Sequence, residues 1–171
     1  VESDSINKKL FLVGQYFSPE KSHSIAKILL MSGLIISIVA NWLTAILVVS
    51  IYLFWGTLYN QLPFKWKKKP VLGWVANSIV GALLFMIGWY LVITNQLNSK
   101  ILFLDIEMLE SMLPYLLCFA SVSLLTTLPD MKGDMESGDK TFPIVYGKIT
   151  TTILSLLFIC AAFVCSLYYE D

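Results

Sequence analysis

The stretch PDMKGDMESGDKTFP, residues 129–143, decides how the chain is organised. It places four acidic residues and two lysines between two long apolar segments, so it must lie outside any hydrocarbon layer that those segments enter. Asp130 and Asp134 are four residues apart, which on a helical turn puts both carboxylates on one face, near enough to share a divalent cation. The spacing also fits a solvated acidic turn that caps two helices, and on spacing alone the turn is the commoner case.

Composition places the rest of the chain in a membrane. Hydrophobic residues make up 57% of the 171 residues and charged residues 14%, which excludes a soluble domain with an ordinary surface. Several apolar runs reach the length of about 20 residues that a helix needs to cross a bilayer. We predict an all-α, polytopic transmembrane helix bundle forming one partial domain over residues 1–171. The predicted spans are 24–40, 43–59, 71–94, 110–128 and 149–169.

The distribution of charge predicts the orientation. The basic residues are twelve lysines with no arginine, and no basic stripe interleaves with aromatic residues, so nucleic acid is not an expected partner whereas membrane lipid is. If all five runs cross, residues 1–22 and the loops 60–70 and 129–148 share one face. With Lys27 counted there, that face holds every lysine except Lys100. The positive-inside rule then puts these loops in the cytoplasm, as in a multi-pass protein of a bacterial inner membrane or its equivalent.

Local signals mark where the first helices begin and end. Ser18 before Pro19 fits an N-cap followed by proline at the first helical position, so we expect a helix to start at residue 19. Asn41 and Trp42 interrupt the apolar sequence that follows, which predicts a tight helical hairpin. The chain has no initiating Met and Val1 begins within a polar segment, so we expect a fragment.

The third span contains small residues and one polar residue. Gly73, Gly81 and Gly88 would permit close contact between helices. Asn77 either bonds a neighbouring helix, as buried asparagines in membranes usually do, or contacts a substrate. The sequence leaves both roles open.

The acidic stretch and the residues after it resemble a known motif. DMKGDMESGDKTFPIVYG, residues 130–147, is similar to the second aspartate-rich motif of the UbiA superfamily of intramembrane prenyltransferases, roughly Asp-x-x-Gly-Asp-x-x-x-Gly-x-x-Thr-hydrophobic-Pro-Val and a closing Gly. The matching residues are Asp130, Gly133, Asp134, Gly138, Thr141, Pro143 and Gly147.

Residues 59–70 resemble a second element of the same family, a loop of the form Tyr-Ser-x-Pro-Pro-x-Arg-x-Lys-Arg-x-Pro. Lysines replace both arginines of that loop, at Lys65 and Lys68, which keeps the charge but loses the bidentate geometry of a guanidinium on phosphate. The retained residues are Tyr59, Pro63, Lys67 and Pro70.

The first eight residues, VESDSINK, resemble the end of the family's first aspartate-rich motif, with Asp4 as its final aspartate. The resemblance therefore covers essentially the whole chain. It implies a bundle of typically nine transmembrane helices, of which these would be the third to the seventh.

The resemblance also implies an activity and its residues. It implies Mg²⁺-dependent transfer of a prenyl group from a polyprenyl diphosphate to a hydrophobic or aromatic acceptor, as in quinone or related lipid biosynthesis. Departure of an allylic diphosphate requires charge neutralisation at the leaving group and no strong protein nucleophile. The implied metal ligands are Asp4, Asp130 and Asp134. The implied catalytic residues are Asp130, Asp134 and Tyr59, and the implied diphosphate-binding residues are Lys8, Lys65, Lys67 and Lys140. Asn77 is a further candidate for diphosphate binding if its role is substrate contact.

An alternative from a different class is a non-catalytic transporter or lipid-binding scaffold whose acidic loop binds a cation. It predicts no affinity for prenyl diphosphates, whereas the enzyme hypothesis requires such affinity to increase with Mg²⁺. Because most of the first motif would precede Val1, we expect the 171 residues alone to be inactive.

Overall fold

The computed structural model describes residues 18–97 and 105–169, and all regular secondary structure within these ranges is helical. This confirms the predicted all-α class. Asp4 and Lys8, which the sequence assigns to the metal and diphosphate sites, lie outside the described residues. The long helices are α2 (Pro19–Ala40), α3 (Trp42–Ile51) continued by the π-helical η1 (Tyr52–Tyr59), α4 (Pro70–Leu97), α5 (Ile106–Thr126) and α8 (Lys148–Tyr169).

The predicted start of the first helix is confirmed. The Ser18 hydroxyl accepts a hydrogen bond from the Lys21 amide at 3.3 Å, and Pro19 occupies the first helical turn. The predicted hairpin is also present, because the single residue Asn41 separates α2 from α3. Its backbone is extended, its amide donates to the Ser37 carbonyl, and its side chain accepts from the Leu43 amide at 2.8 Å. One asparagine therefore ends one helix and begins the next.

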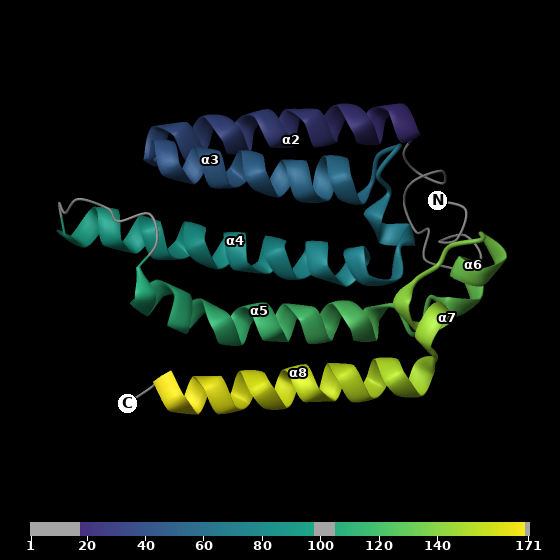
Figure 1. The fold of residues 1–171 in the computed structure, drawn as a ribbon. Helices are drawn as coiled ribbons and strands as arrows, with labels where there is room; N and C mark the ends of the chain where they lie inside the picture. Colours follow the sequence, from purple (N-terminus) through teal and green to yellow (C-terminus); the bar gives the residue numbers. More distant parts are fainter. Residues whose placement is uncertain (1–17, 98–104, 170–171) are drawn as a thin grey trace.

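The long helices follow one another across the bundle in the order of the chain (Figure 1). Helix α2 packs on α3, α3 on α4, α4 on α5, and α5 on α8. Three short helices, η2 (Trp66–Lys68), α6 (Met131–Glu136) and α7 (Phe142–Tyr146), gather at the end of the bundle where α4 and α8 begin (Figure 1). The charged loops thus lie together at one mouth of the bundle.

Close contact between α4 and α5 depends on a glycine. A Cβ atom added at Gly81 would lie 2.3 Å from the ring of Phe119, so only a residue without a side chain fits. The expected role of Gly81 is confirmed. Gly88 forms no such close contact within residues 18–97 and 105–169, because a Cβ there would meet none of their atoms within 4 Å.

Two serines join α5 to α8. The hydroxyls of Ser121 and Ser155 lie 2.6 Å apart and both residues are fully buried. Each hydroxyl also donates to the backbone carbonyl of the other residue, at 2.9 and 3.1 Å. In an apolar medium such reciprocal bonds satisfy both hydroxyls and fix the register of the two helices.

The outer faces of the long helices are apolar. Five helices are long and apolar enough to cross a membrane: Glu20–Ala40, Trp42–Tyr59, Pro70–Ile93, Ile106–Thr126 and Lys148–Tyr169. Large side chains such as Ile36 and Val39 on α2 are 69% and 83% exposed, which water would penalise but lipid or further apolar protein would not.

Candidate functional site at the charged mouth

The two aspartates of the acidic stretch lie on one turn of helix. Asp130 is the N-cap of α6 and Asp134 is in its first turn, and the Asp134 amide donates to the Asp130 carbonyl at 3.0 Å. The predicted helical spacing is therefore confirmed for the backbone. Asp134 is buried, at 9% exposed, and Asp130 is partly buried. A buried carboxylate requires compensating charges or hydrogen bonds, which its surroundings must supply.

A glycine folds the end of the acidic stretch back on its beginning. Gly138 follows α6 with a φ of +70°, a left-handed conformation that residues with a Cβ rarely adopt. This turn allows the Asp139 amide to donate to the Asp134 carbonyl at 2.8 Å. The acidic stretch is thus compact, and Asp139 is buried beside it at 9% exposed.

The lysine-rich loop between η1 and α4 is joined to this stretch by an ion pair. Lys68 Nζ pairs with the Asp139 carboxylate, and the Lys140 amide donates to the Lys68 carbonyl at 3.2 Å. Sequence analysis missed this pair. Its only local signal is that Lys68 stands where the family loop has an arginine, and the partner lies 71 residues further along the chain.

Tyr59 ends η1 between the acidic stretch and α4. It lies close enough to Asp130 and Asp134 to interact with both charges, and it is hydrogen-bonded to the side chain of Asn77. Asn77 Oδ1 also accepts from the Trp55 indole at 2.6 Å, and its Nδ2 donates to the Ser123 hydroxyl at 2.8 Å. Asn77 therefore joins η1, α4 and α5 directly beneath the acidic stretch. Of the two roles that the sequence left open for Asn77, this network shows the bonding between helices. It does not test substrate contact.

The remaining predicted lysines lie in the same region. Lys67 is exposed and borders a small chamber that Tyr59 and Asn77 also line. Lys65 is partly buried in the same loop, and Lys140 is exposed near the end of the acidic stretch. Of the residues predicted from sequence, the structure brings together at this mouth Asp130, Asp134, Tyr59, Asn77, Lys65, Lys67 and Lys140.

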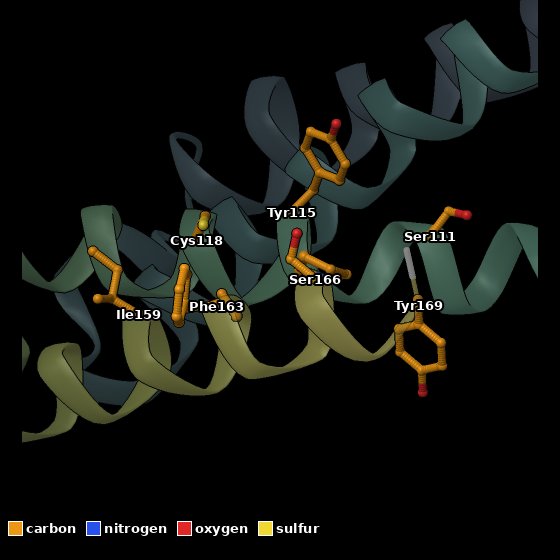
Figure 2. A pocket seen from close by; sticks show the side chains of 9 residues that line it. Ser111, Tyr115, Cys118, Ile159, Phe163, Ser166 and Tyr169 are labelled. Atoms are coloured by element: carbon orange, nitrogen blue, oxygen red, sulfur yellow. The ribbon is translucent and has the colours of Figure 1, made fainter. Parts of the chain in front are cut away.

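A second, larger hollow has a different character. A groove of about 480 Å³ lies between α5 and α8 near the end where α8 finishes, away from the charged loops. Figure 2 shows Tyr115, Cys118 and Phe163 along it. Within the described part of the chain its lining holds no acidic or basic side chain, so it offers no partner for a phosphate group.

The donor set at the mouth fits a hard divalent cation. In residues 18–97 and 105–169 no group of three or more histidine, cysteine or acidic side chains gathers to enclose a metal. Mg²⁺ does not need such a cage, since it keeps several waters and takes one or two carboxylates together with phosphate oxygens. Asp130 and Asp134 are the described residues that would hold it.

An apolar helical bundle with carboxylates and lysines gathered at one mouth is an integral membrane protein with a polar site at its edge. The profile of the UbiA prenyltransferase family matches residues 1–170, and the chain belongs to that family. A relative from Methanobrevibacter smithii, digeranylgeranylglyceryl phosphate synthase, is 28% identical over 145 residues. The alignment covers 80% of this chain and 45% of the relative, so the chain spans less than half of that protein's length. No solved structure matches the chain significantly.

Proposed function

We propose that the protein takes part in Mg²⁺-dependent transfer of a prenyl group from a polyprenyl diphosphate to an acceptor. The observation that carries the proposal is the meeting of the Asp130–Asp134 turn with the lysine-rich loop and Tyr59 at one mouth of an apolar bundle. Carboxylates and lysines together suit a ligand that is a metal-bound diphosphate, and the apolar bundle suits its prenyl chain. Membership of the UbiA prenyltransferase family supports the same activity.

The residues have distinct roles in this proposal. Asp130 and Asp134 hold the cation, with Asp4 as a further ligand implied by the first motif. Lys65, Lys67 and Lys140 contact the diphosphate, with Lys8 implied alongside them, because cations stabilise the charge that develops on the leaving group. Mg²⁺ would supply the same neutralisation directly on the phosphate oxygens. Tyr59 stands beside the acidic pair, where its ring or hydroxyl can contact the allylic end of the donor.

Two acceptor classes are candidates. The Asp-x-x-Asn-Lys sequence at residues 4–8 and the Thr-Phe-Pro sequence at residues 141–143 favour an aromatic, quinone-type acceptor. The name of the relative from Methanobrevibacter smithii favours a prenylated glyceryl phosphate instead. Parallel assays with a phenolic acid and with geranylgeranylglyceryl phosphate would separate them, because polar groups placed to bind a phosphate ester are left unpaired by a planar phenolic ring.

The orientation is part of the proposal. We infer that the charged mouth faces the cytoplasm because the lysines of the described residues lie in the first part of α2, in the η1–α4 loop, in the acidic stretch and at the start of α8 (Figure 1). A cysteine introduced at Phe64 should react with a membrane-impermeant thiol reagent only after the membrane is opened. Labelling of this cysteine in intact cells would show that the charged mouth faces the outside and would contradict the inferred orientation.

The test of the metal site uses the full-length protein in vesicles with geranylgeranyl diphosphate as donor. Asp130→Asn and Asp134→Asn should each lower the rate at least a hundredfold, since they remove charge from a site that neutralises a diphosphate–metal complex. Glu136→Gln, in the same helix but exposed, is the matched control and should retain activity. Full activity in both aspartate variants would remove the metal role. If the transporter or scaffold alternative holds, the unaltered protein will bind no prenyl diphosphate with or without Mg²⁺.

A further inference from the structure

A small, partly enclosed chamber lies at the charged mouth. Its volume is about 40 Å³, which is room for at least one water molecule or for oxygen atoms of a larger group. Residues from four parts of the chain surround it: Tyr59 at the end of η1, Lys67 and Lys69 in the loop, Trp74 and Asn77 on α4, and Ser123, Thr126, Thr127, Thr141 and Phe142 from the end of α5 to the start of α7.

Two residues that line the chamber each carry a buried polar group with no hydrogen-bond partner among the described residues. Thr141 is 7% exposed, and its hydroxyl is buried with no partner among the described residues. The Trp74 indole Nε1 is likewise buried and unpaired within the part of the chain that the structure describes. Burying one such group without a hydrogen bond costs about 1–3 kcal/mol, so two around one small space indicate that something fills it.

Thr141 occupies a position where a threonine hydroxyl usually has a hydrogen-bond partner. It is the N-cap of α7 and has the extended backbone of that position, where threonine usually accepts a bond from the first helical turn. No such bond is present, and Pro143 supplies no amide hydrogen. The hydroxyl is therefore available to the chamber.

The chemistry of the lining favours an occupant that accepts hydrogen bonds. An indole N–H can only donate, and a hydroxyl that does not act as a helix cap is free to donate. Lys67 and Lys69 add positive charge at the rim, whereas Asp130 and Asp134 are not among the lining residues. Tyr59 lines the chamber and also interacts with both of those carboxylates, which places the chamber next to the proposed metal site.

We propose that Trp74 and Thr141 bind one phosphoryl oxygen of the prenyl diphosphate, with the rest of the head group held between the lysines and the aspartate pair. This inference rests on the proposed function and extends it to two residues that donate hydrogen bonds rather than charge. The prenyl chain lies outside the chamber, because a space of this size is far smaller than a polyprenyl chain.

The test compares Trp74→Phe and Thr141→Val, each of which removes one donor while keeping the shape. The phenyl ring retains the aromatic contact that Trp74 makes with Phe158, at 5.4 Å between centroids. Trp89→Phe on the same helix, outside the chamber, and Thr150→Val at an exposed position of α8 are the matched controls. The binding probes are inorganic pyrophosphate and geranylgeranyl diphosphate, each with Mg²⁺, together with geranylgeraniol.

Each chamber variant should raise the Kd of both diphosphate probes roughly tenfold, the usual effect of losing one hydrogen bond to a charged group. The affinity of the chamber variants for geranylgeraniol should be unchanged. The two control variants should bind all three probes as the unaltered protein does. Thr141→Ser, which restores the hydroxyl, should recover the affinity of the unaltered protein.

A direct observation does not depend on the variants folding. In the unaltered protein labelled with ¹⁵N-tryptophan, pyrophosphate and Mg²⁺ should shift one indole resonance. That resonance is assigned to Trp74 by its absence from the spectrum of Trp74→Phe, or by paramagnetic relaxation if the variant does not fold. Diphosphate binding by the unaltered protein with no indole shift and no change in Kd in either variant would overturn the inference and assign the chamber to water. Absence of diphosphate binding in the unaltered protein would instead overturn the proposed function.

Discussion

The ion pair between Lys68 and Asp139 should hold the lysine-rich loop on the acidic stretch. Two unit charges about 4 Å apart attract by about 4 kcal/mol at an effective dielectric constant of 20. The Asp139 side chain is 9% exposed and that of Lys68 is 35% exposed, so solvent screening and the cost of ordering the lysine remove most of this attraction. A net coupling of about 1–2 kcal/mol remains.

A double-mutant cycle with Lys68→Met and Asp139→Asn measures that coupling. Both single variants should lower the free energy of unfolding in detergent, and the double variant should lose less than their sum by about 1–2 kcal/mol. Each single variant should also weaken Mg²⁺-pyrophosphate binding about five- to thirtyfold, because the loop that carries Lys67 is no longer fixed. Lys148→Met, exposed at the start of α8, is the control for removing a positive charge.

Salt dependence provides a second check on the same pair. Exposed pairs are screened within a Debye length of about 8 Å at physiological ionic strength, whereas a pair with one buried member is screened less. The coupling should therefore persist in 0.5 M salt, a concentration chosen to exceed physiological strength several-fold. Additive single variants, with a coupling below about 0.3 kcal/mol, would refute this account of how the two segments are joined.

Three further predictions follow from the packing and from the proposed metal. Gly81→Leu should destabilise the α4–α5 contact by about 1–3 kcal/mol through its clash with Phe119, whereas Gly88→Leu, which meets open space, should cost much less; thermal unfolding in detergent compares them. Ser121→Ala and Ser155→Ala should each cost about 0.5–1.5 kcal/mol, and the double variant more than either single variant, since each single change leaves the other hydroxyl bonded to a backbone carbonyl. Chelation of Mg²⁺ should abolish pyrophosphate binding and added Mg²⁺ should restore it, so calorimetric affinity that is indifferent to the chelator would contradict the metal role.

Short segments of the sequence predict most of the helices and where they begin and end. Apolar runs long enough to cross a bilayer identify the helices, Ser18 and Pro19 mark where α2 begins, and Asn41 separates α2 from α3. These signals are local, because hydropathy and helix capping act over one or two turns. The Asp130 and Asp134 spacing is local in the same sense, and the helical turn that it predicts is present.

The site itself depends on contacts between distant segments. The pairing of Lys68 with Asp139, the three-helix network at Asn77 and the chamber beside Trp74 and Thr141 each require particular rotations of packed helices. Sequence alone gave Asn77 two roles without deciding between them. A membrane helix is apolar around most of its circumference, so hydropathy states that it crosses but not which face it turns to its neighbours. That choice is made by packing at positions such as Gly81, and only the tertiary structure reveals it.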